Sequence, residues 1–189
     1  MAERVAVVTG GTRGIGRAIS EALKGAGYKV AATYGGNEEV AHRFTKETEI
    51  PAYKFDVCDF AGCQAGTKRI AHDLGPIEVL VNNAGITRDG TLQKMTFEQW
   101  NAVVQTNLGS CFNMCRCVID TMRERGFGRI VNIGSINGQA GQYGQVNYAA
   151  AKSGMHGFTK ALAQEGASKG ITIVAGMPKI CAAAAIPWA

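Results

Sequence analysis

The sequence predicts an α/β protein built on a doubly wound parallel sheet, with helices on both faces of the sheet. Short apolar runs rich in β-branched residues alternate with longer helical patterns, as in a series of βαβ units. A glycine-rich turn lies between the first apolar run and the first helical pattern. Small or polar residues directly follow four of the apolar runs. Ligands of such sheets bind beyond the carboxyl ends of the strands, so we expect a functional site at that edge.

The apolar runs are nearly continuous, which indicates strands that are covered on both faces. The expected strands are Val5–Val8, Val30–Thr33, Ala52–Phe55, Val79–Val81, Ile130–Ile133 and Ile171–Val174. The expected helices are Ile15–Ala26, Glu38–Thr48, Ala61–Leu74, Thr96–Arg123 and Tyr148–Lys169. The segments that end four of the strands are Gly10–Gly16, Asp56–Val57, Asn82–Gly85 and Gly134–Ser135.

The glycine-rich turn has the context of a Rossmann-type dinucleotide site, with a strand before it and a helix after it. Its glycines permit a tight turn and let backbone N–H groups approach a pyrophosphate at the helix N-terminus. A turn without a ligand is the alternative, and the flanking strand and helix argue against it. The residues expected to hold the cofactor here are Gly10, Thr12, Arg13, Gly14, Ile15 and Gly16.

The end of the second strand bears on which dinucleotide binds. An Asp or Glu there would bind the ribose 2′-hydroxyl of NAD, but the chain has Thr-Tyr-Gly-Gly-Asn at positions 33–37, with Gly35 expected beside the cofactor. A 2′-phosphate meets no carboxylate there, and Arg13 can pair with it. The sequence therefore favours NADPH. Glu38 and Glu39 argue the other way, but we interpret them as acids in the first turn of the next helix.

Length and composition narrow the classes of protein. A chain of 189 residues predicts one domain, here residues 1–174, with an atypical tail at 175–189. The net charge of +5 lacks a basic block, so we expect an anionic ligand rather than nucleic acid. Without a transmembrane-length apolar stretch or a signal peptide, the expected location is the cytoplasm, away from membranes. The six cysteines and three histidines lack ligand spacing, so we expect free thiols and no metal.

Tyr148 and Lys152 lie four residues apart on one expected helix and so share a face. A phenol is a weak acid or base near neutral pH, because its ordinary pKa is about 10, and a neighbouring ammonium favours the phenolate. Ser135, at a strand end, can hydrogen-bond a substrate oxygen. These three residue types suit proton transfer between a carbonyl and an alcohol. A solvated helix face is the alternative for the Tyr–Lys pair alone.

From residue 4 to about residue 173 these segments resemble the short-chain dehydrogenase/reductase family in order and spacing. The matching pieces are Thr9–Gly16, Asn82–Gly85, Asn107, Ser135 and Tyr148-x3-Lys152. The resemblance implies that Tyr148 protonates the developing alkoxide and that Lys152 assists it and holds the nicotinamide ribose. It implies that Ser135 orients the carbonyl and stabilises the oxyanion.

The resemblance also implies a role for Asn107 in holding a water of the proton relay, with a bend in its long helix as the alternative. It places Asp56 and Val57 beside the adenine. The residues that it places along the cofactor are Asn83, Ala84, Gly85, Ile86 and Thr87.

Two branches of the family are similar to this chain: the acyl-carrier-protein 3-oxoacyl reductases of fatty acid synthesis and the acetoacetyl-CoA reductases of polyhydroxybutyrate synthesis. The glutamine-rich segment 137–148 looks more like the second branch, although by itself it reads as a polar flexible loop. That branch implies NADPH-dependent reduction of acetoacetyl-CoA to (R)-3-hydroxybutyryl-CoA by a homotetramer. The residues that it implies contact the acyl-CoA are Asp89, Lys94, Gln142, Tyr143, Gly144 and Gln145.

The resemblance ends after Val174, where relatives continue with a substrate lid, further helices and a last strand. Residues 175–189 match nothing in that pattern, and we interpret them as a frameshifted or incomplete sequence. A catalytically idle dinucleotide-binding protein is therefore a third alternative.

Overall fold

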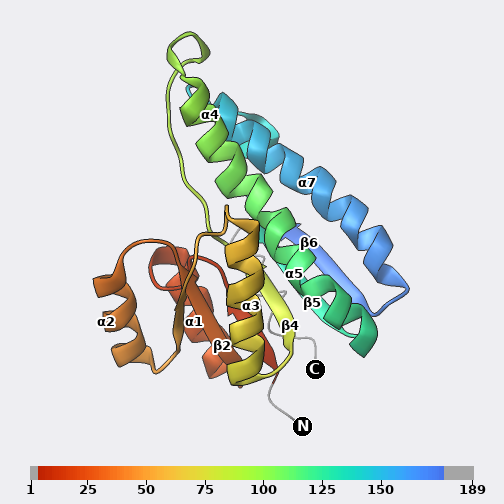
Figure 1. The fold of residues 1–189 in the computed structure, drawn as a ribbon. Helices are drawn as coiled ribbons and strands as arrows, with labels where there is room; N and C mark the ends of the chain where they lie inside the picture. Colours follow the sequence, from red (N-terminus) through yellow and green to blue (C-terminus); the bar gives the residue numbers. More distant parts are fainter. Residues whose placement is uncertain (1–3, 177–189) are drawn as a thin grey trace.

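A six-stranded parallel sheet forms the centre of the computed structural model, which describes residues 4–176 (Figure 1). The strands lie in the order β3-β2-β1-β4-β5-β6, so the chain reverses direction across the sheet between β1 and β4. The carboxyl ends of these two strands form the switch point at which ligands of such sheets bind. The strands are β1 Val5–Val8, β2 Lys29–Tyr34, β3 Ala52–Lys54, β4 Ile77–Asn82, β5 Gly128–Ile133 and β6 Ile171–Gly176.

Helices cover both faces of this sheet, which confirms the predicted fold class. Alternate residues of a strand point to opposite faces: Val5 and Val7 of β1 belong to one core cluster, and Ala6 and Val8 to the other. Side chains of α3, α5 and α7 pack on the first face, and those of α1 and α2 on the second. The helices are α1 Gly14–Gly25, α2 Glu38–Thr48, α3 Phe60–Leu74, α4 Phe97–Val104, α5 Ser110–Arg125, α6 Asn137–Ala140 and α7 Val146–Ala167, with short turns η1 Leu92–Lys94 and η2 Gln105–Gly109.

The helix expected at Thr96–Arg123 is found as a continuous helical segment from Phe97 to Arg125, but it is not α-helical throughout, because a π-helical turn, η2, lies between α4 and α5. Asn107 lies in this turn, and its Nδ2 donates to the carbonyl oxygens of Ile86 at 2.8 Å and Val103 at 2.9 Å. The bond to Ile86 joins the helix to the loop after β4. Periodicity cannot reveal such a tertiary bond, since it registers only which face of a helix is apolar.

The boundaries of three elements between residues 137 and 176 also differ from those expected. Helix α6 begins within a segment that we expected to be a loop, and α7 starts at Val146 and ends at Ala167, two residues before each expected boundary. The expected tail begins at residue 175, but residues 175 and 176 continue β6. The rest of that tail lies outside the described residues.

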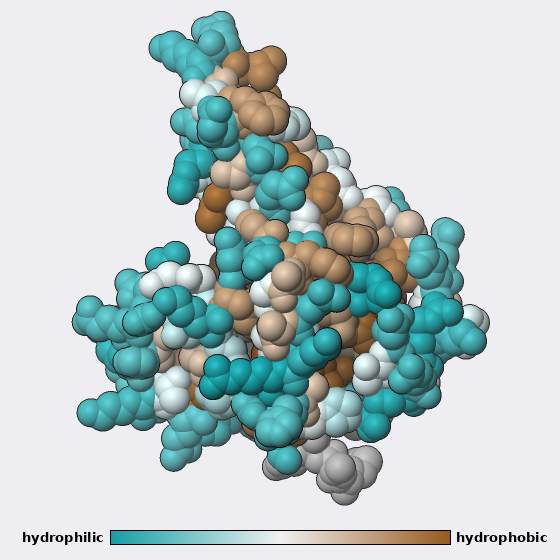
Figure 2. Space-filling view, viewed as in Figure 1, coloured by the Kyte–Doolittle hydropathy of each residue, from teal (hydrophilic) through white to brown (hydrophobic). Residues whose placement is uncertain are grey.

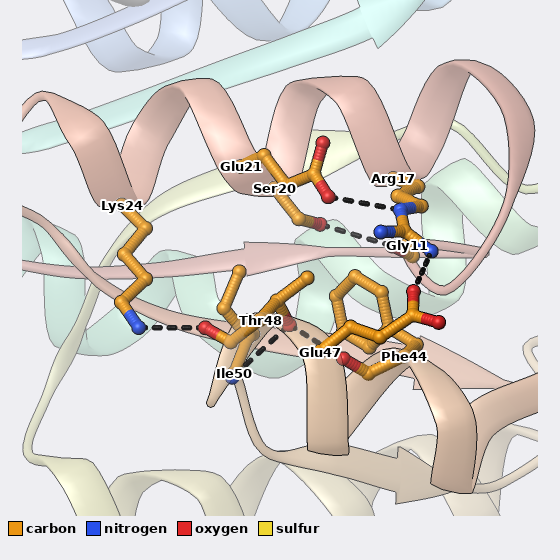
Figure 3. Close-up of polar contacts among 9 residues, drawn as sticks. All are labelled: Gly11, Arg17, Ser20, Glu21, Lys24, Phe44, Glu47, Thr48 and Ile50. Atoms are coloured by element: carbon orange, nitrogen blue, oxygen red, sulfur yellow. Dashed lines mark hydrogen bonds and ion pairs between the residues drawn. The ribbon is translucent and has the colours of Figure 1, made fainter.

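Polar contacts attach α1 to its neighbours (Figure 3). The Arg17 guanidinium bonds Glu21 at 2.8 Å and Glu47 of α2 at 2.7 Å, and Lys24 Nζ donates to the Thr48 carbonyl oxygen at 2.6 Å. These groups are exposed, so each contributes little to stability. In contrast, Ser20 Oγ is buried and donates to the Gly11 carbonyl oxygen at 3.1 Å. That bond fixes the glycine-rich turn on α1.

Buried thiols provide a test of the core on the α3 and α5 side of the sheet. Burial raises the pKa of Cys63 to about 12 and that of Cys111 to about 11. An unfolded cysteine ionises near pH 8.5. Groups whose pKa is raised by folding stabilise the protein below the unfolded pKa, and that stabilisation is lost as the pH rises toward the folded pKa.

We therefore expect the free energy of unfolding to fall by on the order of 1 kcal/mol or more between pH 8 and pH 10. Urea denaturation at several pH values measures this, and Cys63→Ala should reduce the slope. A stability that stays flat from pH 8 to pH 10 in the unmodified chain would contradict the assignment of these thiols to the core.

Candidate active site

A cavity of about 690 Å³ lies at the switch point of the sheet. The glycine-rich turn, the end of β2, the residues after β3 and the end of β4 line it. Most residues predicted to hold the cofactor are among its walls: Gly10, Thr12, Arg13, Gly14, Ile15, Gly16, Gly35, Asp56, Val57, Asn83, Ala84, Gly85 and Ile86. Sequence reasoning did not assign a cofactor role to Thr33, Tyr34, Gly36, Asn37, Val40, Phe55 and Thr106, which also line it. All but Thr106 lie near the ends of β2 and β3, which were already expected to lie beside the cofactor.

The N-terminus of α1 opens on this cavity and can hold an anion. No side chain caps the helix, and its first turn carries no acidic residue. The first N–H groups of a helix lack intrahelical acceptors, and the helix dipole favours negative charge there. A Cβ atom on Gly16 would lie 2.2 Å from the Gly10 carbonyl oxygen and 2.6 Å from Asn83 Nδ2, so the turn closes only with glycine. These features fit a dinucleotide pyrophosphate.

Hydrogen bonds between Thr9 and Asn83 join the ends of β1 and β4. Thr9 Oγ1 accepts from the backbone N–H groups of Asn83 at 2.9 Å and Ala84 at 3.0 Å. Asn83 Nδ2 donates to the carbonyl oxygens of Thr9 at 2.9 Å and Gly10 at 3.3 Å. The two loops that line the cavity are therefore held as one unit. The sequence motif includes Thr9 but predicts no role for it; the signal that could have indicated one is its place directly before the first glycine.

Neither Glu38 nor Glu39, the two acids that follow β2, lines this cavity. Glu38 and Glu39 lie in the first turn of α2, which Asn37 caps by accepting from the Val40 N–H at 3.0 Å. Glu38 pairs with Lys54, and that hydrogen bond holds the pKa of Glu38 below its usual range. Arg13, at the N-cap of α1, is exposed at the same cavity.

A second cavity, of about 510 Å³, brings the predicted catalytic residues together. Ser135, Tyr148, Lys152 and Asn107 all line it, together with Thr87. It shares Ile15, Asn83, Gly85 and Ile86 with the dinucleotide cavity, so the two are adjacent along one wall.

Tyr148 and Lys152 lie one turn apart on α7, with Lys152 Nζ 5.7 Å from the centroid of the Tyr148 ring. Lys152 is 4% exposed, and burial lowers its pKa. Its Nζ donates to the carbonyl oxygen of Ile133, the last residue of β5, at 2.6 Å. The ammonium is thus fixed between the sheet and the phenol. Ser135 follows β5 by two residues and is half-buried.

Asn107 is fully buried, and both of its Nδ2 bonds are to protein carbonyls. Its Oδ1, however, has no hydrogen-bond partner among the described residues. A Cβ atom on Gly85 would lie 2.5 Å from that oxygen, so glycine at position 85 leaves room beside it. A buried oxygen without a partner costs free energy, and a bound water would satisfy it.

The residues expected to contact an acyl-CoA are only partly brought together. Asp89 and Gln145 are hydrogen-bonded, and the Gly90 N–H donates to the Gly144 carbonyl oxygen at 2.8 Å. Tyr143 is 87% exposed. Gln142 and Lys94 are exposed too, and neither they nor the other four predicted residues line the two cavities described.

Two asparagines that sequence reasoning missed connect this region to the catalytic residues. Asn147 is buried; its Nδ2 donates to the Arg88 carbonyl oxygen at 2.9 Å, and its Oδ1 accepts from the Tyr148 N–H at 2.7 Å. Asn137 contacts Ser135 and Gln145. The only signal in the sequence was their nearness to Ser135 and Tyr148.

None of the helices in residues 4–176 is long and apolar enough to cross a membrane. Within the same range, no three His, Cys, Asp or Glu side chains are arranged to hold a metal ion.

Comparison with known proteins identifies the family of this chain. The family model for short chain dehydrogenases matches residues 4–186. An acetoacetyl-CoA reductase of Shinella zoogloeoides is 63% identical over 175 residues, which are 93% of this chain and 73% of that protein. The acetoacetyl-CoA reductase of Rhizobium meliloti is 62% identical over the same shares of the two chains. The 3-oxoacyl-acyl-carrier-protein reductase of Escherichia coli is 42% identical over 90% of this chain and 70% of its own. The chain therefore belongs to the short-chain dehydrogenase family.

Proposed function

We propose that this oxidoreductase is an acetoacetyl-CoA reductase, which uses NADPH to form (R)-3-hydroxybutyryl-CoA for polyhydroxybutyrate synthesis. The observation that carries the proposal is the single cavity lined by Ser135, Tyr148 and Lys152 beside the dinucleotide cavity. Relatives at 61–63% identity named acetoacetyl-CoA reductase support the substrate. The carrier-protein reductase activity is the second candidate, supported by the 42% identical relative.

The roles of the side chains follow from their chemistry. A bound nicotinamide dinucleotide supplies the hydride that adds to the carbonyl carbon. The Ser135 hydroxyl donates a hydrogen bond to the carbonyl oxygen, and the Tyr148 phenol gives that oxygen its proton. Lys152 keeps positive charge beside the phenol and offers its remaining protons to the ribose. Asn107 holds a water of the proton relay at its free Oδ1.

NADPH is favoured over NADH because Arg13 of the glycine-rich turn lines the cavity and no carboxylate from the end of β2 does. Arg13 is exposed at the cavity, whereas Glu38 is occupied by Lys54. A guanidinium binds phosphate oxygens with two parallel hydrogen bonds. The ribose 2′-phosphate would therefore lie beside Arg13 and Gly35. Thr87, which lines the second cavity, would contact the nicotinamide end of the cofactor.

The acyl-CoA would be bound on the side of the site formed by the loop after β4 and the start of α7. Asp89, Gly144 and Gln145 form the fixed part of this surface, and Lys94, Gln142 and Tyr143 are its exposed cationic, amide and phenol groups. Amides and a phenol suit the pantetheine amides, and an ammonium suits a phosphate.

We further propose a cytoplasmic homotetramer. Figure 2 shows apolar side chains gathered along α4 and α5, among charged ones. Phe112 on α5 is 55% exposed and Phe97 on α4 is 74% exposed. A cavity of about 400 Å³ lies between α5 and α7. Large exposed apolar patches mark contact surfaces, and a second copy covering α5 and α7 would bury this one.

The proposal is tested by following NADPH absorbance with purified protein of this sequence. We expect oxidation of NADPH with acetoacetyl-CoA, and at least about tenfold lower kcat/KM with NADH or with acetoacetyl-acyl carrier protein, a difference of about 1.4 kcal/mol. A tenfold preference for the carrier-protein thioester would favour the second candidate. Dinucleotide binding without turnover of either thioester would show an idle binding protein instead.

A further inference from the structure

Three hydrogen bonds connect the catalytic serine to a carboxylate outside the cavity. The backbone N–H of Asn137 donates to Ser135 Oγ at 3.2 Å, and the side-chain Nδ2 of Asn137 donates to Gln145 Oε1 at 2.8 Å. Gln145 Nε2 then donates to Asp89 Oδ2 at 2.9 Å. We propose that Asn137, Gln145 and Asp89 are positioning residues, which orient the Ser135 hydroxyl for the reaction proposed above. The inference rests on that proposed function for the role of Ser135.

The Asp89 carboxylate determines which group donates and which accepts in the two hydrogen bonds between side chains. An ionised Asp89 only accepts hydrogen bonds, so it selects the NH₂ side of the Gln145 amide. The Gln145 carbonyl oxygen must then face Asn137, where it can only accept, and this selects the NH₂ side of the Asn137 amide. A single negative charge thereby fixes the orientation of two amides that could otherwise flip.

At its Ser135 end, this series of hydrogen bonds leaves the proton of the serine hydroxyl free. The Asn137 N–H supplies a donor to Ser135 Oγ, so the hydroxyl acts as acceptor in that bond. Its own O–H remains available to donate toward a carbonyl oxygen. Accepting one hydrogen bond strengthens a hydroxyl as a donor to another. The arrangement therefore favours the hydroxyl orientation that carbonyl reduction requires.

Both elements that carry the chain are held firmly. The loop after β4 is attached to the start of α7 by the bond between Gly90 and Gly144 and by the bond from Asn147 to the Arg88 carbonyl oxygen. Helix α6 lies against the catalytic lysine: a Cβ atom on Gly138 would lie 2.8 Å from the Lys152 carbonyl carbon. Only glycine permits this approach. Asp89 thus has a fixed base from which to orient Gln145.

A charge exchange tests the chain. Gln145→Glu alone places two carboxylates together and removes the donor to Asp89. Adding Asp89→Asn supplies a new amide that donates to the introduced carboxylate, which still accepts from Asn137. We expect Gln145→Glu to lower kcat about tenfold with a smaller change in KM, and the double variant to recover kcat to within about threefold of the original chain. Gln139→Glu, the same change on exposed α6 surface, should leave kcat unaltered.

A raised KM with unaltered kcat, and no recovery in the double variant, would overturn the inference, since it would mean that Gln145 acts only by direct contact with substrate.

A measurement that needs no turnover separates this inference from the proposed function. Hydrogen exchange of the backbone amide of Asn137, followed by NMR, should be faster in Gln145→Glu and slow again in the double variant. Unchanged exchange in Gln145→Glu would overturn the positioning chain even in an active enzyme. The unmodified protein could be inactive while the amide of Asn137 still exchanges faster in Gln145→Glu and slowly in the double variant. That result would overturn the proposed function and leave the three hydrogen bonds established.

Discussion

Replacing Tyr148 with phenylalanine is expected to lower kcat for acetoacetyl-CoA reduction by about a thousandfold. The half-buried ring keeps its shape and its place near Lys152, 5.7 Å from the ring centroid. What is lost is the O–H group, which is the proposed proton donor to the developing alkoxide. The NADPH dissociation constant should change by less than about threefold, because the turn that holds the pyrophosphate is untouched. Steady-state kinetics and fluorescence titration of NADPH measure the two quantities.

Tyr53→Phe is the matched control for this change. Tyr53 lies on β3, and its hydroxyl contacts Asp73 at 3.1 Å, away from both cavities. Its loss should lower stability slightly and leave kcat unaltered. If Tyr148→Phe retained a tenth or more of the original kcat, another group would have to be the acid.

The second large effect is expected at Gly16, where alanine should abolish measurable NADPH binding. The alanine Cβ would lie 2.2 Å from the Gly10 carbonyl oxygen. This contact is too short, so backbone atoms must move apart to relieve it. Movement there opens the turn around the pyrophosphate and disturbs Asn83, whose Nδ2 would lie 2.6 Å from the new methyl. Overpacking of this kind also costs about 1–3 kcal/mol of stability. Isothermal titration with NADPH and urea denaturation measure the two losses.

Gly25→Ala tests whether the effect is local to the turn. Gly25 lies at the other end of the same helix, where an added Cβ would meet nothing within 4 Å. Alanine there should keep NADPH affinity and raise stability by about 0.5–1 kcal/mol, since glycine disfavours helices. Tight NADPH binding by Gly16→Ala would show that the pyrophosphate does not lie on this turn.

The strands were predictable because each is a short apolar run between polar segments, and the structure confirms all six within two residues at each boundary. The π-helical turn at Gln105–Gly109 was not predictable from the apolar pattern, and neither was the bond from Asn107 within it to Ile86, since the two residues belong to different segments. The same limit applies to α6, whose four residues are too few to show a helical period.

The gathering of Ser135, Tyr148 and Lys152 was predictable from motif spacing, because a strand end and a helix face bring them to one edge. Asn107 was predicted to join them only by the resemblance to the family. The residues that orient them were not predictable. Asn137 and Asn147 make specific hydrogen bonds whose partners lie in other segments, and an asparagine near a turn carries no sign of which carbonyl it will reach.

Because the N-terminus of α1 is uncapped, the free energy of unfolding of this protein depends on the anions in the solution. An anion bound there satisfies N–H groups that the chain itself leaves to solvent, so each occupant adds RT ln(1 + [L]/Kd) to the free energy of unfolding. We expect phosphate and sulfate to bind there as well as the cofactor, and to compete with it for the same turn. Melting temperatures of variants can then be compared only at equal buffer anion and cofactor concentrations.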